Sequence, residues 1–139
     1  MAFTVFKGSS ADGSPLFGFF DEKYTSFDDK KSYPWVLQLD IVANDLAQNR
    51  LPTGAANIVL NDFEDSIGEI LSHSTPIIFF GHVTGDGGRV AYFYLLSPTP
   101  SYEILTKLCA GNPMRQMQFE IEHDPEWDRI AHMASSHRK

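Results

Sequence analysis

The stretch QMQFEIEHDPEWD, residues 116–128, carries the clearest structural signal in the chain. Apolar and polar residues alternate in its first half, which is the pattern of a half-buried strand. The apolar face would carry Met117, Phe119 and Ile121, and the polar face Gln118, Glu120 and Glu122. Asp124 then occupies the position of a helix N-cap, and Pro125 follows where a missing N–H costs little. The stretch therefore predicts a strand followed at once by a helix over residues 124–139.

The segments before this stretch alternate between strand and helix patterns. A mostly apolar run at 35–42 predicts a strand in the middle of a sheet. Apolar residues recur every three or four positions over 55–71, which predicts an amphipathic helix with Val59 and Ile70 among its inward residues. Two β-rich runs, 76–83 and 89–96, are separated by a glycine-rich loop and predict antiparallel neighbours. Residues 98–110 predict a second helix, with Tyr102 and Leu105 facing inward.

From Trp35 onward the predicted order is strand, helix, strand, strand, helix, strand. Two interleaved split βαβ units of this kind form an α+β ferredoxin-like βαββαβ core, with both helices on one face of the sheet. We expect a single domain of 139 residues, made of an N-terminal β-hairpin and connector (1–34), the core (35–123) and a C-terminal helix (124–139). The other sheet face needs a cover. The hairpin, the last helix around Trp127 or a second subunit could provide it.

Composition limits the class of protein. Hydrophobic residues make up 42% of the chain and aromatic residues 13%, which is enough for a packed core. The single cysteine, Cys109, excludes an internal disulfide, and no segment approaches the roughly eighteen apolar residues of a membrane span or resembles a secretory signal. We therefore expect a cytoplasmic protein without membrane contact. A formal net charge of -7 argues against nucleic-acid binding, because phosphate backbones would be repelled.

Three segments carry a resemblance to a known family. They are the helix at 60–71 with its acidic outer face, the Gly87-Gly88-Arg89 opening of the aromatic strand 91–94, and the acidic stretch 120–127 that ends in Asp-Pro-x-Trp. Over roughly 35–127 the chain resembles the bacterial domain of unknown function six-nine-five, which is related in fold to the regulator of ribonuclease activity B. That regulator binds a protein partner, so the resemblance implies a protein-interaction role. We expect a non-enzymatic protein-interaction or regulatory module, with a homodimer as one form. The chain lacks the regulator's long acidic tails and adds the N-terminal hairpin.

One set of residues supports an alternative function. A small enzyme or ligand-binding domain could have a pocket bounded by Arg89, Tyr92, Tyr94, Glu120 and Glu122. Each residue also has a structural interpretation, since Arg89 could pair with the glutamates across the sheet and the tyrosines could pack on it. A concave pocket formed by all five would favour a ligand-binding domain. A filled sheet face would favour a protein partner.

Other chemistry is poorly supported by the sequence. His132 and His137 are five residues apart and would diverge on a helix, so with His123 they do not predict a metal site. No serine or cysteine has a positioned base in the sequence pattern, and the glycine loop before Arg89 joins two strands instead of opening a helix. We expect no catalytic residue, no metal and no cofactor. The sequence names neither a ligand nor a partner.

Overall fold

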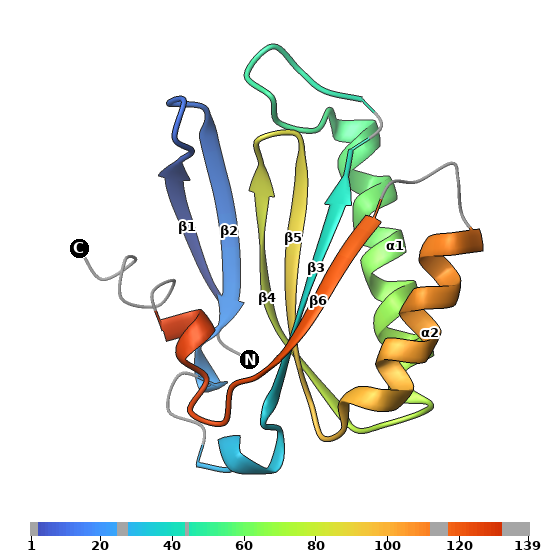
Figure 1. The fold of residues 1–139 in the computed structure, drawn as a ribbon. Coiled ribbons are helices and arrows are strands. Elements are labelled where there is room, and N and C mark those ends of the chain that lie inside the picture. Colours follow the sequence, from blue (N-terminus) through green and yellow to red (C-terminus); the bar gives the residue numbers. More distant parts are fainter. Residues whose placement is uncertain (1–2, 25–27, 44, 112–116, 132–139) are drawn as a thin grey trace.

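A single antiparallel sheet organises the protein. The computed structural model describes residues 3–24, 28–43, 45–111 and 117–131. Its strands are β1 (Phe3–Ser9), β2 (Pro15–Asp21), β3 (Trp35–Val42), β4 (Ile77–Gly85), β5 (Gly88–Leu95) and β6 (Met117–His123). They form a six-stranded sheet in the order β1-β2-β4-β5-β3-β6, and every neighbouring pair is antiparallel (Figure 1). The fold class is therefore α+β, as the sequence predicts.

Two helices, α1 (Gly54–Ser72) and α2 (Pro98–Gly111), lie on the same side of this sheet (Figure 1). Leu60 and Ile67 of α1 and Leu105 of α2 belong to one buried cluster with alternate residues of β3 and β5. Alternate residues of a strand point to the same side of a sheet, so both helices must cover that side. The expectation that both helices share one face is confirmed.

The opposite face of the sheet is covered by the C-terminal segment. Trp127 and Ile130 are buried there against Phe80 and Tyr94 of the central strands. The Trp127 ring stacks on Tyr94 with a centroid distance of 3.9 Å and an interplanar angle of 12°. Its Nε1 donates a hydrogen bond to the Tyr33 carbonyl at 3.0 Å. The N-terminal hairpin, β1 and β2, instead extends the sheet beyond β4.

The start of the C-terminal helix differs from the prediction. Helical conformation begins at Asp128 and continues to Ala131, and the expected residues 132–139 lie outside the described part of the chain. The Asp124 carboxylate accepts hydrogen bonds from the backbone N–H groups of Asp128 and Arg129, so Asp124 does cap this helix. A turn closes first, in which the Trp127 N–H donates to the Asp124 carbonyl and Trp127 adopts a φ of 58°. Because of this turn, the helix begins at Asp128, and the Trp127 ring packs against Tyr94.

Helix α1 buries a narrower stripe than its apolar pattern suggests. Thr53 caps it by accepting a hydrogen bond from the Ala56 N–H. The predicted inward residues Val59 and Ile70 are each 42% exposed, whereas Glu64 is buried. In α2, Tyr102 is likewise exposed, while Leu105 is buried as expected. No helix in the described part of the chain combines the length and apolar character that crossing a bilayer requires.

Candidate functional site

The five residues predicted to share a pocket lie on two sides of the sheet. Arg89 has the same parity along β5 as the helix-side residues Ala91 and Phe93, whereas Tyr92 and Tyr94 have the opposite parity. Successive side chains of a strand point to opposite faces, so the Arg89 side chain and the tyrosine side chains lie on different faces, although Arg89 and Tyr92 both line one hollow at the β4–β5 turn. The five-residue pocket is therefore not formed. The binding role of each residue remains a prediction.

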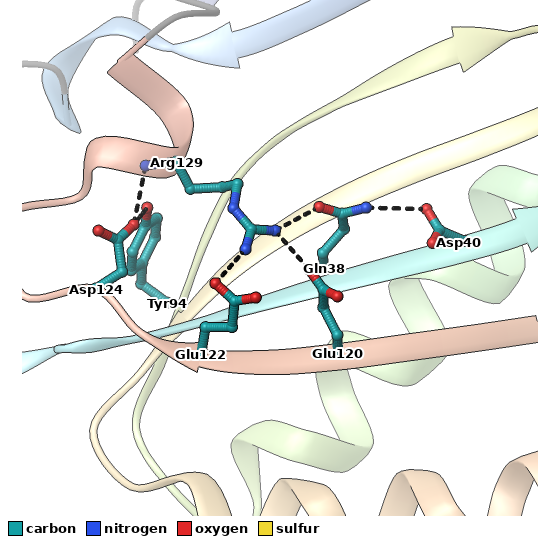
Figure 2. Close-up of polar contacts among 7 residues, drawn as sticks. All are labelled: Gln38, Asp40, Tyr94, Glu120, Glu122, Asp124 and Arg129. Carbon is teal, nitrogen blue, oxygen red and sulfur yellow. Dashed lines mark hydrogen bonds and ion pairs between the residues drawn. The ribbon is translucent and has the colours of Figure 1, made fainter.

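The acidic residues of β6 are paired with a cation that the sequence did not suggest. Arg129 extends from the C-terminal segment toward β6 and β3 (Figure 2). Its guanidinium lies 2.9 Å from Glu120 and 2.5 Å from Glu122, and it donates a hydrogen bond to the Gln38 side-chain oxygen at 2.6 Å. Partial burial lowers the pKa of Arg129, but hydrogen bonds from its guanidinium to Glu120 and Glu122 outweigh burial and raise it. Arg129, and not Arg89, is the partner of these glutamates.

Tyr92 and Tyr94 lie on the sheet face opposite the helices and pack with the C-terminal segment. Tyr94 is fully buried, and its hydroxyl donates a hydrogen bond to Asp124 at 2.8 Å (Figure 2). Burial, followed by the bond to the Asp124 carboxylate, raises the pKa of Tyr94 well above its usual value. Burial also raises the pKa of Tyr92, which lines a hollow of about 430 Å³ together with Asp40. Tyr94 is therefore covered by the C-terminal segment, whereas Tyr92 borders a hollow.

Arg89 is the centre of a buried polar cluster on the helix side. Its side chain is 2% exposed. The guanidinium donates hydrogen bonds to the hydroxyl of Thr84 at 3.0 Å and to the side-chain oxygens of Asn61 at 2.7 Å and Asn57 at 2.8 Å. The Glu64 carboxylate lies 3.6 Å away. Burial lowers the pKa of Arg89, and the nearby carboxylates of Glu64 and Asp65 oppose this effect.

Glu64 also orients His82 of β4. The Nδ1 atom of His82 lies 2.8 Å and 3.1 Å from the two carboxylate oxygens of Glu64. Their side chains are 12% and 8% exposed, respectively. Phe19 packs edge-on against the imidazole at a centroid distance of 4.2 Å. The carboxylate therefore holds the ring with Nδ1 inward, and Nε2 makes no hydrogen bond to any residue in the described part of the chain.

This polar cluster forms one end of a pocket of about 680 Å³. Its lining residues come from β1, β2, β4, β5, α1 and the segment before α1. Figure 1 shows that β1 and β2 extend the sheet past the two helices. Its apolar lining comes from the N-terminal hairpin and from the segment just before α1: Val5, Phe17, Phe19, Leu51 and Pro52. Its polar lining is Asn57, Asn61, His82, Thr84 and Arg89. Of the five predicted site residues, only Arg89 reaches this pocket.

Sequence reasoning missed most of the polar lining, although a signal was present. Asn57, Asn61 and Glu64 are spaced by four and three residues, which places them in one polar stripe along α1. His82 and Thr84 alternate on the strand that faces this stripe. In the described residues, no group of three or more histidine, cysteine, aspartate and glutamate side chains could hold a metal ion.

The fold and the site define an α+β domain with one antiparallel sheet and an open pocket between α1 and the N-terminal hairpin. Residues 6–131 match the model of a family of unknown function (DUF695), so the chain belongs to this family. The match begins within β1, which places most of the hairpin inside the family region and extends the resemblance beyond 35–127. No curated protein and no solved structure matches the chain.

Proposed function

We propose that the protein is a ligand-binding domain that takes a small, partly apolar molecule into the pocket beside α1. The observation that carries this proposal is the combination of an apolar lining with a buried, hydrogen-bonded polar end formed around Arg89. Small-molecule sites are typically clefts of about 300 to 1,000 Å³ with apolar walls and a few placed polar groups. A pocket of about 680 Å³ falls within this range.

The buried charges support a functional interpretation of this end of the pocket. Removing an arginine, a glutamate and a histidine from water costs free energy, and packed apolar residues would avoid that cost. Arg89 and Glu64 are nevertheless among the buried residues, and both contribute to the hydrogen-bonded cluster around the pocket. Perturbed titratable groups in a cleft are more common at functional sites than elsewhere.

We propose binding without catalysis. The sequence contains no nucleophile motif, and the thiol of Cys109 donates a hydrogen bond to the Met117 carbonyl, between α2 and β6. Burial raises the pKa of this thiol, which makes it a poor nucleophile. The described lining residues include no serine, cysteine, aspartate or glutamate, and we propose that His82 and Thr84 contribute hydrogen bonds there and not a nucleophile.

A protein-interaction module, as a monomer or a homodimer, is a second proposal. It is supported by β6, which pairs only with β3 among the described strands and exposes Gln118, Glu120 and Glu122. An open strand edge is a common surface for adding a strand from a partner. The pairing of both glutamates with Arg129 weakens this proposal, because it reduces the negative charge available to a basic partner.

The finer structural and cellular predictions are also proposals. The order β4-β5-β3-β6 supports a ferredoxin-like core to which the hairpin is added. The kinship with the regulator of ribonuclease activity B, a bacterial origin and a cytoplasmic location rest on the sequence resemblance and composition described above. Direct binding of nucleic acid remains disfavoured by the net charge of -7.

A neutral fluorescent probe tests the proposed function. N-phenyl-1-naphthylamine brightens in apolar sites, and we expect it to bind the wild-type pocket. Val5 lines the pocket and is 71% exposed, so Val5→Glu should weaken probe binding at least tenfold while the protein stays folded. Val59→Glu is the matched control, because Val59 is also exposed but lies outside the pocket lining. Absence of a fluorescence increase, or equal losses in both variants, would contradict the proposal.

A further inference from the structure

Building on the proposed binding function, we infer that the ligand of this pocket is an amphipathic carboxylate whose oxygen atoms accept hydrogen bonds from the side-chain amides of Asn57 and Asn61. Its apolar body would lie along the hairpin side of the pocket. The inference names a chemical class, medium-chain aliphatic or aryl carboxylic acids. Four observations carry it.

The first observation is the orientation of the two amides. A guanidinium has only hydrogen-bond donors, so the amide atom that faces Arg89 must be the oxygen in both asparagines. The distances of 2.7 Å to Asn61 Oδ1 and 2.8 Å to Asn57 Oδ1 agree with this assignment. The Nδ2 groups must then point away from the guanidinium. Both asparagines can therefore donate hydrogen bonds from Nδ2 only to a group other than Arg89.

The second observation is the spacing of these donors. Asn57 and Asn61 are four residues apart on α1, which places them on one face about 6 Å apart, and both line the pocket. Neither Nδ2 group donates a hydrogen bond to another residue in the described part of the chain. Two neighbouring donors suit the two oxygens of one carboxylate. Asn57 is also the fourth residue of α1, near the end of the helix that favours negative charge.

The third observation is the sign of the charges around the pocket. Arg89 and His82 are the ionisable residues among the described lining residues, and no aspartate or glutamate belongs to that lining. Glu64 is not part of that lining, and its carboxylate contacts His82 Nδ1 and lies 3.6 Å from Arg89. The Nε2 atom of His82 adds a further hydrogen-bonding position at the same end of the pocket. An anionic group would meet donors and a buried cation there, despite the negative net charge of the whole protein.

The fourth observation is the apolar surface that remains open. Val5 is 71% exposed and Phe17 is 40% exposed, and both line the pocket together with Phe19. Large apolar side chains that are exposed to solvent beside the polar end of the pocket favour an amphipathic ligand. A short alkyl chain or an aromatic ring would remove these side chains from water.

Paired probes separate this inference from the proposed function. Isothermal titration calorimetry would compare hexanoate with hexanamide, which has the same chain and a neutral head group. We expect hexanoate to bind at least tenfold more tightly, because hydrogen bonds to a charged acceptor are the stronger ones. Equal affinities would overturn the carboxylate inference and leave the proposed function standing. Failure of both probes to bind would contradict both.

An isosteric variant tests the assigned donors directly. Asn61→Asp keeps an oxygen facing Arg89 but replaces the amide donors with a carboxylate oxygen. Because Asn61 is exposed, the variant should fold, and we expect its affinity for hexanoate to fall at least tenfold while that for hexanamide changes less than about threefold. Asn49→Asp adds the same charge in the exposed segment before α1, outside the pocket lining, and should leave both affinities unchanged. Unchanged hexanoate binding in Asn61→Asp, or an equal loss in Asn49→Asp, would refute the inference.

Discussion

Replacing Arg89 by methionine tests whether the polar cluster at the pocket is as buried and as closely coupled as the structure shows. Methionine preserves much of the aliphatic length of the side chain and removes its charge and all of its donors. The Arg89 side chain is 2% exposed and makes hydrogen bonds to Thr84, Asn57 and Asn61. The variant would also leave the Glu64 carboxylate buried without the guanidinium 3.6 Å away.

The expected cost is large because one partner of a buried charge pair is removed. Such changes typically cost about 3 to 5 kcal/mol, since the remaining charge stays buried without compensation. Glu64 keeps its contact with His82, and water can reach the exposed side chain of Asn61, so we expect the lower end of this range, about 3 kcal/mol. For a chain of this size that corresponds to a fall in Tm of roughly 10 °C.

Urea denaturation followed by far-ultraviolet circular dichroism would measure this cost. Arg50→Met is the matched control, because the Arg50 guanidinium pairs with Asp86 at 3.1 Å in an exposed position and should contribute less than about 1 kcal/mol. The double variant Arg89→Met, Glu64→Gln should lose less stability than the sum of its single variants, because it removes both buried charges. The reasoning is refuted if Arg89→Met costs no more than Arg50→Met.

Three further predictions concern the opposite face of the sheet. Trp127→Ala should lower the free energy of unfolding by about 3 to 5 kcal/mol, because the indole is 1% exposed and stacks on Tyr94; an unchanged Tm would show that it is not core. The raised pKa of Tyr94 means that above about pH 10 the unfolded state loses this proton while the folded state keeps it, so stability should fall as pH rises. In Tyr94→Phe the slope of unfolding free energy against pH should be shallower by about 1.4 kcal/mol per unit, and an unchanged slope would contradict the assignment. Arg129→Gln should cost only about 1 kcal/mol in low salt and less in 1 M NaCl, because both glutamates are more than half exposed; a cost independent of salt would argue against ion pairing.

Much of the secondary structure follows from sequence periodicity. The strand predicted at 35–42 has the same bounds as β3, because its apolar residues are continuous and it lies between two other strands. The helix predicted at 55–71 differs from α1 by one residue at each end. These elements are set by local patterns that tertiary contacts do not override.

The start of the C-terminal helix depends on contacts that no local pattern contains. Asp124 and Pro125 are good helix-start residues, yet the helix begins at Asp128. The stacking of Trp127 on Tyr94 and its hydrogen bond to Tyr33 fix the turn before it. Tyr33 and Trp127 are far apart in sequence, so this turn could not be derived from residues 116–128 alone.

The site could be predicted only in part, for two different reasons. The odd spacing of Arg89 and Tyr92 along β5 already predicts that their side chains point to opposite faces, although both residues line the hollow at the β4–β5 turn. The cation that pairs with Glu120 and Glu122 could not be identified from residue spacing. Arg129 reaches these residues only because the chain reverses direction after β6. Buried Glu64 was missed because charged residues on helices are usually exposed.

We propose that the pocket beside α1, and not the acidic surface of β6, is the binding site. A titration of ¹⁵N-labelled protein with hexanoate, followed by two-dimensional NMR of backbone and asparagine side-chain amides, distinguishes the two surfaces. We predict that the largest shift changes fall on Phe17, Phe19, Asn57, Asn61 and His82, with the side-chain amide signals of the two asparagines moving together. Shift changes centred on Glu120 and Glu122, or a spectrum that hexanoate leaves unchanged, would contradict the claim.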